Sequence, residues 1–368
     1  MRIAHIIIKG VEVSGGIEKY ALELGSRLVN RGHEVDVYAI RRYKPLYSDY
    51  KGVRIIPLPS LKGRIFEKLS ATFVASLDQL IRKSDIVHYH AFGQSILSFI
   101  PKLRGKPILL QGHGIEWMRS RWGAGGRLFF RLTEGPSLKI ADRVTVVSKV
   151  QKEYFKKKYN VDTVYIPPGI DEPVRRKPNL IRALGLEGND YVLFASRLVR
   201  EKGAHYLIEA FSRLETDKKL VIVGDVRNED SYKAELKKLA KQKPDKIIFT
   251  GYVSREMLQE FYSNAYLFVL PSELEGLSAG LLEAMSYGNA CLVSDIEENR
   301  EGLGTDGFYF RNRDVDDMTS VLKTLLASEE TLKDMREKAL SKIMTAHSWD
   351  TVTDQIERLY GEIVEDVR

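Results

Sequence analysis

Short apolar runs alternate with amphipathic helical segments along almost the whole chain of 368 residues. Residues 3–8 and 35–40 have the composition of buried strands, and residues 18–30 between them carry apolar side chains at helical spacing. A strand, a helix and a second strand in this order predict a parallel pair, because parallel strands need a long crossover connection. The alternation returns in the second half, with strand-like runs at 191–195, 220–225, 246–251 and 265–270. The sequence therefore predicts an α/β protein with parallel sheets.

A proline-rich segment separates the two series of strands and helices. Pro167, Pro168, Pro173 and Pro178 fall in it, together with several charged residues. This composition is typical of a stiff linker. We therefore expect two domains with a boundary between residues 172 and 173, which agrees with the length of the chain.

Positive charge is concentrated in the first of these domains. Residues 1–172 contain 29 Lys and Arg against 16 Asp and Glu, a net charge of +13, and residues 173–368 contain 28 against 34, a net charge of −6. A basic half favours an anionic acceptor or an anionic membrane surface as partner, and a solubilising surface is the simpler alternative. Nucleic acid is not expected as a partner, because no recognisable binding module accompanies the charge.

The sequence predicts neither a membrane-spanning segment nor a secretory leader. Its apolar runs are shorter than the roughly 20 residues of a membrane span, and residues 2–8 lead into a glycine turn and a charged helix, not a cleavage site. We expect a cytoplasmic protein, with peripheral contact at the inner membrane face as a further option. The single cysteine, Cys291, lies in an apolar run, which predicts a buried thiol and excludes an intramolecular disulfide.

The stretch 271–285 has the strongest signs of a ligand site. It follows the strand-like run 265–270, contains Gly and Ser, and continues into a helical segment that ends at Gly288. A turn that opens a helix favours anion binding, because free backbone N–H groups and the positive end of the helix dipole converge there. We expect this helix to begin near Gly276.

Two carboxylates, Glu275 and Glu283, bracket the expected helix start. Two acceptors on either side of a set of amides suit a ligand with hydroxyl groups at both ends and phosphates between them, and a nucleotide-sugar has that layout. The alternative interpretation is that Glu275 complements the helix dipole and that Glu283 lies on a solvated face.

Two cations, Arg197 and Lys202, lie in the loop between the strand-like run 191–195 and the next helical segment. Cations at this position are able to stabilise a departing diphosphate. The alternative interpretation is a pair of solvated surface charges.

In the first domain, Gly15 and Gly16 form a turn between the first strand and the first helix. Ligands of such sheets bind outside the carboxyl ends of the strands, and glycines let a backbone approach a phosphate or a sugar closely. The turn lacks the full Gly-x-Gly-x-x-Gly spacing, so an ordinary dinucleotide site is not predicted. His113 follows another strand and lies between two glycines, which makes it a second candidate at this edge. We interpret His88 and His90 as packing or hydrogen-bonding residues.

No metal or other cofactor is expected. The chain has no His and Cys residues at metal-ligand spacing, and the string Asp314-Val-Asp316 fits a helix start better than a metal site.

Four motifs of the second half resemble those of the retaining glycosyltransferases of family 4: Ser-Arg197-Leu-Val-Arg-Glu-Lys202-Gly, Phe-Thr-Gly251-Tyr-Val, Val-Leu-Pro-Ser272 and Glu275-Gly-Leu-Ser-Ala-Gly-Leu-Leu-Glu283-Ala-Met-Ser-Tyr-Gly288. The similarity covers nearly the whole chain. It implies the GT-B fold, with two Rossmann-like, doubly wound parallel-sheet domains facing a central crevice. It also implies that the last helix returns to the N-terminal domain, which gives domains of residues 1–172 plus 350–368 and of residues 173–349.

The resemblance further implies roles for single residues. Glu275 contacts the donor sugar and Glu283 the ribose hydroxyls, while Arg197 and Lys202 stabilise the leaving nucleoside diphosphate. Backbone groups lie near the diphosphate and the base, at Gly276, Leu277, Ser278, Tyr252 and Val253. The other domain closes the site through the Gly15–Gly16 turn and through His113 near the sugar and acceptor.

The activity implied is transfer of a sugar from a nucleotide-diphosphate donor to a hydroxyl of a glycan or glycolipid acceptor, with retention and without a metal. Two alternatives stay open: a sugar-nucleotide epimerase on the same kind of fold, and a non-catalytic subunit that binds a nucleotide-sugar. Many family members have Gly where this chain has Ser196, and Gly-Phe-Gly where it has Gly-Leu-Ser. The donor base, the sugar and the acceptor are therefore not predicted.

Overall fold

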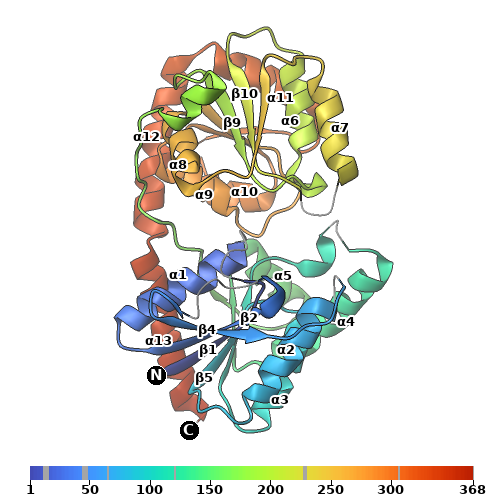
Figure 1. Ribbon diagram of the computed structural model, residues 1–368, viewed down its shortest axis with the longest axis vertical. Helices are drawn as coiled ribbons and strands as arrows, with labels where there is room; N and C mark the ends of the chain where they lie inside the picture. Colours follow the sequence, from blue (N-terminus) through green and yellow to red (C-terminus); the bar gives the residue numbers. More distant parts are fainter. Residues whose placement is uncertain are drawn as a thin grey trace. The chain divides into compact units, whose positions relative to one another are not determined.

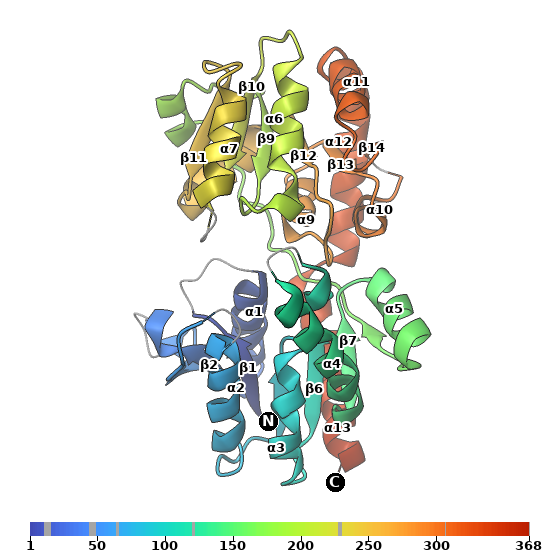
Figure 2. The ribbon, with the colours of Figure 1, turned by 90° about the vertical axis from the view of Figure 1, so that its right-hand side faces the viewer.

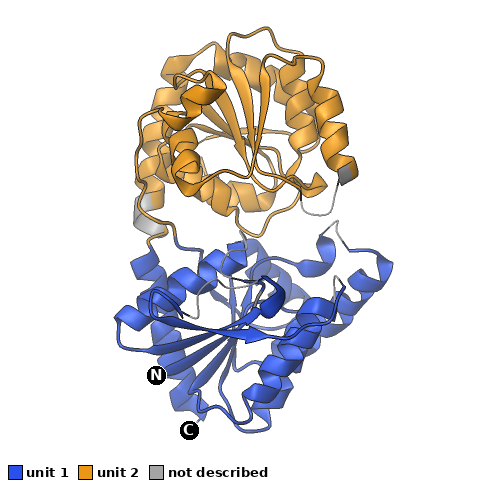
Figure 3. Ribbon diagram, in the orientation of Figure 1, with its two compact units in different colours: residues 1–169, 349–368 blue, residues 170–348 orange. Residues whose placement is uncertain are grey.

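The computed structural model describes residues 1–10, 16–43, 49–63, 66–119, 122–226, 230–305 and 307–367. The chain divides into two compact units, shown in Figure 3. Unit 1 consists of Met1–Gly169 and Trp349–Arg368, and unit 2 of Ile170–Ser348. The bounds expected from the sequence were residues 1–172 plus 350–368 and residues 173–349.

Unit 1 is built on an eight-stranded sheet with the strand order β3-β4-β2-β1-β5-β6-β7-β8. Figure 1 labels β1, β2, β4 and β5 of this sheet. Every pair is parallel except β3 with β4. The strands are β1 (Arg2–Ile8), β2 (Glu34–Ile40), β3 (Asp49–Tyr50), β4 (Val53–Leu58), β5 (Ile86–Tyr89), β6 (Ile108–Gly112), β7 (Arg143–Val146) and β8 (Val164–Tyr165).

The sheet of unit 1 is doubly wound. From β1 the chain moves outward to β2 and β4, and it then crosses back to place β5 on the other side of β1. Ile3 pairs with Val35 on one side and with Ile86 on the other. The strand order therefore reverses between β1 and β5, and the carboxyl ends of these two strands form the usual ligand-binding position of such a sheet.

Helices cover both faces of this sheet. They are α1 (Gly16–Asn30), α2 (Phe66–Asp78), α3 (Phe99–Lys102), α4 (Ala124–Ile140), α5 (Lys149–Tyr159) and α13 (Trp349–Val367), with short 3-10 turns η1 (Arg41–Tyr43), η2 (Gln94–Ser98) and η3 (Glu116–Met118). Neighbouring residues of β1 point to opposite faces, as strand geometry requires. Ile3 packs in a cluster with α1 and α13, and Ala4 in a cluster with α2, α4 and α5.

The C-terminal helix α13 belongs to the core of unit 1. Its buried side chains recur at helical spacing, at Val352, Ile356, Leu359, Tyr360 and Ile363, and all lie in the cluster that contains Ile3. Trp349 opens the helix and is buried against Tyr20, with the Arg27 guanidinium 5.0 Å from the centre of its ring. A side chain at Gly169 would lie 2.3 Å from Trp349, so a glycine is required there.

Unit 2 contains a six-stranded, fully parallel sheet with the order β11-β10-β9-β12-β13-β14. Its strands are β9 (Tyr191–Ala195), β10 (Lys219–Val223), β11 (Ile247–Gly251), β12 (Leu267–Leu270), β13 (Cys291–Ser294) and β14 (Phe308–Phe310). Its helices are η4 (Leu180–Leu184), η5 (Arg200–Lys202), α6 (Ala204–Ser212), α7 (Asp230–Ala240), α8 (Arg255–Asn264), α9 (Ala279–Ser286), α10 (Glu297–Leu303), α11 (Val315–Leu326) and α12 (Glu329–Ala346).

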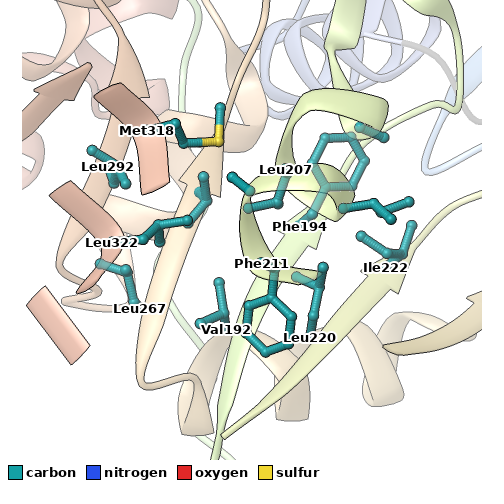
Figure 4. Close-up of a cluster of buried hydrophobic side chains, with 14 of the residues drawn as sticks. Val192, Phe194, Leu207, Phe211, Leu220, Ile222, Leu267, Leu292, Met318 and Leu322 are labelled. Atoms are coloured by element: carbon teal, nitrogen blue, oxygen red, sulfur yellow. The ribbon is translucent and has the colours of Figure 1, made fainter. Parts of the chain in front are cut away.

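The core of unit 2 lies between the sheet and the helices α6 and α11 (Figure 4). Val192 and Phe194 of β9 and Leu220 of β10 pack against Phe211 of α6 and Leu322 of α11. These strands read as continuous apolar runs because both faces of a parallel sheet are covered. Cys291 is buried in β13, which confirms the prediction of a buried thiol.

No helix in the described part of the chain combines the length and the apolar character that crossing a bilayer needs.

Candidate functional site

The strand order of unit 2 reverses between β9 and β12, so the loops that follow these two strands lie side by side at one edge of the sheet. The first loop, residues 196–203, carries Arg197 and Lys202. The second, residues 271–278, carries Glu275 and leads into α9. In doubly wound sheets this position is where ligands bind. The structure thus brings the two motifs with the strongest sequence signal to the place where the fold favours a site.

The two loops are in direct backbone contact. The Glu273 N–H donates to the Glu201 carbonyl over 2.9 Å. Gly203 has a φ of +70°, and a Cβ there would lie 1.9 Å from the Pro271 carbonyl oxygen. Only glycine fits this conformation and this close approach, so Gly203 fixes the distance between the loops.

Lys202 and Glu275 form an ion pair across the two loops. Their side chains are only 11% and 6% exposed. At such low exposure each charge depends on the other for compensation. A diphosphate that reached Lys202 would take over the role of the carboxylate and release Glu275 to accept hydrogen bonds from ligand hydroxyls.

The helix start at this site differs from the prediction. Helix α9 begins at Ala279 and not near Gly276, because Ser278 is the N-cap: its Oγ accepts a hydrogen bond from the Leu281 N–H over 3.4 Å. Serine is among the strongest capping residues, and it lies two positions further along than the expected start. Gly276, Leu277 and Ser278 therefore form a buried turn before the helix, and the first turn of α9 follows it directly.

Glu283 lies inside α9, where its carbonyl accepts a hydrogen bond from Ser286 Oγ over 2.8 Å. Its side chain is half-buried. Burial, and then the nearby charge of Glu283, hold the pKa of Tyr262 well above its ordinary value. Glu283 is therefore close to Tyr262, whose hydroxyl lies near Gly280 in the first turn of α9.

Arg197 is half-buried in the loop that follows β9. The backbone on either side of Arg197 is hydrogen-bonded to the end of β10 and the residues after it. The Ser196 N–H donates to the Val223 carbonyl and the Leu198 N–H to the Asp225 carbonyl, each over 3.1 Å. A Cβ at Gly224 would lie 2.0 Å from the Ser196 carbonyl oxygen, so this glycine permits the approach. Arg197 is therefore held at the carboxyl edge of the sheet by its backbone.

Tyr252 and Val253 follow β11, at the same carboxyl edge, and Tyr252 is exposed. The strands β10 and β9 lie between β11 and β12. The turn is anchored to β10 by a hydrogen bond from the Gly224 N–H to the Gly251 carbonyl, 3.0 Å long. The structure thus places these two residues at one side of the Lys202–Glu275 pair, toward the sheet edge.

One acidic residue near the site was not singled out from the sequence. Burial, and next the negative charge of Glu275, raise the pKa of Glu298 in α10 above its ordinary value. The following residue, Asn299, donates to the Ser294 carbonyl over 3.1 Å, and Ser294 Oγ donates to the Ser272 carbonyl over 2.5 Å. This network supports the loop that carries Glu275. Its members lie in ordinary-looking helical and strand segments, so only their position in space identifies them.

The candidates of unit 1 lie near its own point of strand reversal. Gly16 is the first residue of α1, and a Cβ there would meet no other atom within 4 Å. Gly15 lies outside the described residues. His113 follows β6 directly and is half-buried.

His113 is the end of a chain of three histidines. Its Nε2 lies 3.3 Å from His90 Nδ1, and His90 Nε2 lies 2.8 Å from His5 Nδ1. Burial lowers the pKa of both His5 and His113 to about 3 and that of His90 well below its ordinary value. The imidazoles are therefore neutral, so each link needs one N–H donor and one acceptor, and the chain fixes matching tautomers. The interpretation of His90 as a hydrogen-bonding residue is confirmed.

Among the described residues, one group has potential metal-ligand atoms close together. It consists of the buried His5, His88 and His90, whose ligand atoms lie within 4.8 Å of one another. The ring of His88 stacks on that of His90 at 4.1 Å, and a metal has to lie in the plane of each ring that binds it. This stacking favours a packed, hydrogen-bonded cluster over a metal site. The sequence did not predict the cluster, because His5 lies on β1, 85 residues before His90.

The other suspected metal motif is a helix start, as predicted. Asp314 is the N-cap of α11, and its side chain accepts a hydrogen bond from the Asp317 N–H over 2.9 Å.

Comparison with known proteins agrees with this geometry. Residues 14–172 match the model of the family described as Glycosyltransferase Family 4, and residues 176–342 match that of Glycosyl transferases group 1. An Escherichia coli UDP-Gal:alpha-D-GlcNAc-diphosphoundecaprenol alpha-1,3-galactosyltransferase is 27% identical over 388 aligned residues, which cover 99% of this chain and 97% of the relative. An alpha-D-kanosaminyltransferase of Streptomyces kanamyceticus is 26% identical, over 84% of this chain and 87% of the relative.

Solved structures show the same fold at lower sequence identity. A sucrose-phosphate synthase from Thermosynechococcus elongatus superposes with a TM-score of 0.85 at 21% identity, covering 99% of both chains. Anabaena HepE in complex with UDP and glucose gives a TM-score of 0.82 at 18% identity, over 98% of this chain and all of the other. With two parallel-sheet units and matches to both halves, the chain belongs to the glycosyltransferases of family 4 and group 1, and it has their GT-B fold.

Proposed function

We propose that this glycosyltransferase moves a hexose from a nucleotide-diphosphate donor to a hydroxyl of a glycan or glycolipid acceptor, with retention at the anomeric carbon. The observation that carries the proposal is the Lys202–Glu275 pair at the reversal point of the unit 2 sheet, next to the capped start of α9. It joins a cation for the diphosphate and a carboxylate for sugar hydroxyls in one place.

The diphosphate of the donor is assigned to Arg197, Lys202 and the turn Gly276–Ser278 before α9. Two cations and the positive end of a helix dipole favour a ligand with several negative charges. Glu283 would accept hydrogen bonds from the ribose, and the backbone at Tyr252 and Val253 would contact the base. Uridine diphosphate sugars are the first donors to test, because UDP is named both for the E. coli relative and for the Anabaena structure.

The reaction breaks the bond between the anomeric carbon and the diphosphate oxygen, and it forms a bond from the acceptor oxygen to the same carbon. Positive charge develops on the sugar ring and negative charge on the diphosphate. Arg197 and Lys202 stabilise the second of these charges electrostatically, and we propose that they do so without a metal. Attack from the face that the diphosphate leaves lets a phosphate oxygen take the acceptor proton, and it produces retention. Glu275 hydrogen-bonds the sugar hydroxyls during this step.

The acceptor is assigned to the basic unit 1. Residues 1–172 carry a net charge of +13, which favours an anionic or lipid-linked acceptor. The name of the E. coli relative includes alpha-D-GlcNAc-diphosphoundecaprenol, and a diphosphate on a lipid is anionic. Gly16 and His113 are the residues of unit 1 that we assign to the sugar and acceptor. A cytoplasmic enzyme in peripheral contact with the inner membrane face fits this assignment.

An assay with uridine, guanosine and adenosine diphosphate hexoses tests the proposal. Each donor is incubated with the protein, with and without a membrane extract or lipid-linked glycan acceptors, and proton NMR follows the donor and the anomeric configuration of the product. We expect sugar transfer that depends on the acceptor and keeps the configuration of the donor. Acceptor-independent conversion of the donor into a second sugar nucleotide would identify an epimerase, and an inverted product would contradict retention.

A further inference from the structure

Helix α2 exposes its large apolar residues and buries its small and polar ones. Phe66, Phe73 and Leu77 are 63%, 47% and 40% exposed. They are spaced by seven and four residues, so they lie within about 20° of one line along the helix. The fully buried residues of α2 are small or polar, namely Glu67, Ala71, Thr72, Ala75 and Ser76, and the half-buried Val74 packs on the same core. This is the reverse of the usual surface helix, in which the apolar stripe faces the core.

The apolar stripe of α2 continues onto neighbouring elements. Leu61 before α2 and Ile81 after it are exposed, and so are the pairs Phe99 and Leu103 at α3 and Leu128 and Leu132 on α4. Each pair is spaced by four residues and so forms one side of a helical turn. Figures 1 and 2 show α2, α3 and α4 as neighbours on one face of unit 1. We call these six side chains, together with Phe66, Phe73 and Leu77 of the stripe, the α2–α4 face.

Basic residues are interleaved with these apolar side chains. The segments 61–83, 99–106 and 124–140 contain 11 Lys and Arg against 3 Asp and Glu, a net charge of +8. Arg127, Arg131 and Lys139 are exposed on α4. Of the three acids, Glu67 and Glu134 are buried, and Glu134 accepts hydrogen bonds from tyrosines. Asp78 is partly exposed and is paired with Arg82. The face therefore presents apolar and positive groups to the solvent.

Unit 2 has no comparable surface in its described residues. Its exposed large apolar side chains are Val174, Leu180 and Tyr252, and they lie on separate elements. Single apolar residues of this kind are normal on a protein surface, whereas a contiguous apolar face indicates an interaction.

We propose that the α2–α4 face docks on an anionic lipid bilayer. Phenylalanine and leucine side chains from three neighbouring helices insert at the boundary between headgroups and acyl chains, and the interleaved Lys and Arg contact anionic headgroups. The charge of the face selects a negatively charged bilayer over a neutral one. The inference deepens the proposed lipid-linked acceptor, on which it rests for its biological meaning, but it uses no residue of the Lys202–Glu275 site.

Co-sedimentation of the full chain with vesicles tests the docking. We expect binding to vesicles of phosphatidylcholine with phosphatidylglycerol, and little binding to phosphatidylcholine alone. Phe73→Ser with Leu77→Ser removes apolar contact, and Arg127→Gln with Arg131→Gln removes charge. Each pair is expected to weaken binding about tenfold or more, because apolar burial and the attraction of basic residues to anionic headgroups both favour the bound state. Leu180→Ser in unit 2 is the matched control, and its binding is expected to equal that of the wild type.

Two further measurements distinguish membrane docking from dimerisation through the same face and from a defect in the donor site. Light scattering measures whether the free protein is a monomer or a dimer. If the wild type is a dimer and Phe73→Ser with Leu77→Ser is a monomer, a second copy of the chain covers the face, and the proposal is overturned. Equal binding of both double variants and the wild type would also overturn it. Binding of UDP without vesicles serves as an independent readout: docking variants are expected to keep it, so loss of docking with intact UDP binding leaves the proposed function standing.

Discussion

Lys202 and Glu275 neutralise one another in a nearly buried ion pair that links the loop after β9 to the loop after β12. The family resemblance assigns the two residues to opposite ends of the reacting bond, Lys202 to the diphosphate and Glu275 to the sugar. Their pairing explains how two charges remain stable at such low exposure. It also makes both residues contribute to folding, so a loss of activity in either variant has to be separated from a loss of stability.

The stability of the pair is tested by a double-mutant cycle. Lys202→Met leaves Glu275 as an unpaired charge that is 6% exposed. We expect a loss of about 3 kcal/mol in the free energy of unfolding of unit 2. Lys202→Met combined with Glu275→Gln removes both charges and is expected to recover most of that loss, while activity stays absent. Urea unfolding measures this, and a double variant no more stable than Lys202→Met would contradict a direct coupling.

The fold could be predicted largely from the sequence, because the strands and helices of a doubly wound protein have distinct periodicities. The string that begins at Asp314 was interpreted as a helix start, and the Asp314 side chain accepts a hydrogen bond from the Asp317 N–H. The start of α9 was predicted wrongly, because Gly276 and Ser278 both have the character of a helix start and the choice depends on how the preceding loop packs. Local signals identify an element more reliably than its ends.

For the site, too, the sequence identifies single residues more reliably than the contacts between them. Lys202 and Glu275 were recognised as candidates, but their ion pair depends on the neighbourhood of β9 and β12, which sequence periodicity alone does not reveal. Glu298 and the histidine chain were missed as partners because they approach the site residues only in the folded state.

Glu298 predicts a pH dependence of stability. Burial, followed by the charge of Glu275, raises the pKa of Glu298 in the folded protein. An acid whose pKa is higher in the folded than in the unfolded state opposes folding when it is ionised, and this cost disappears as the pH falls below its unfolded pKa. Glu298→Gln is therefore expected to be more stable than the wild type near pH 8, with a difference that shrinks toward about pH 4.

Urea unfolding of both proteins across this range checks the prediction for Glu298. Glu297→Gln, at the exposed neighbouring position, is the control. A gain from Glu298→Gln that persists unchanged at the acid end of the range would contradict the titration account.

The histidine chain predicts a positioning role for His90. His90→Ala removes the partner of His113 Nε2, 3.3 Å away, so the tautomer and orientation of His113 are no longer fixed. We expect kcat to fall roughly tenfold while the KM for the donor changes little, because unit 1 is assigned to the acceptor side. His90→Gln, which can still hydrogen-bond, is expected to recover part of the rate. Equal loss in both variants, together with a lower Tm, would indicate a purely structural role.

Gly203 predicts that the spacing of the two loops is essential. A methyl group at this position adopts an unfavourable φ of +70° and meets the Pro271 carbonyl at 1.9 Å. Gly203→Ala is therefore expected to lower stability by about 1–3 kcal/mol and to weaken nucleotide binding by moving Lys202 away from Glu275. Gly361→Ala is the matched control, since a Cβ there meets nothing within 4 Å inside α13, and it is expected to be neutral or to stabilise the helix by up to about 1 kcal/mol. Thermal unfolding and UDP titration compare the two.

The most direct test of the donor site is calorimetric titration of nucleoside diphosphates into the wild type, Lys202→Ala and Arg200→Ala. Arg200 lies in the same 3-10 turn as Lys202, but it is exposed and paired with Glu235. We predict that at least one of UDP, GDP and ADP binds the wild type, that Lys202→Ala binds it about 10–100-fold more weakly through loss of a charge-assisted contact, and that Arg200→Ala binds it normally. Absence of binding by all three nucleotides, or equal affinity of Lys202→Ala and the wild type, would contradict the assignment of the donor site to the Lys202–Glu275 pair.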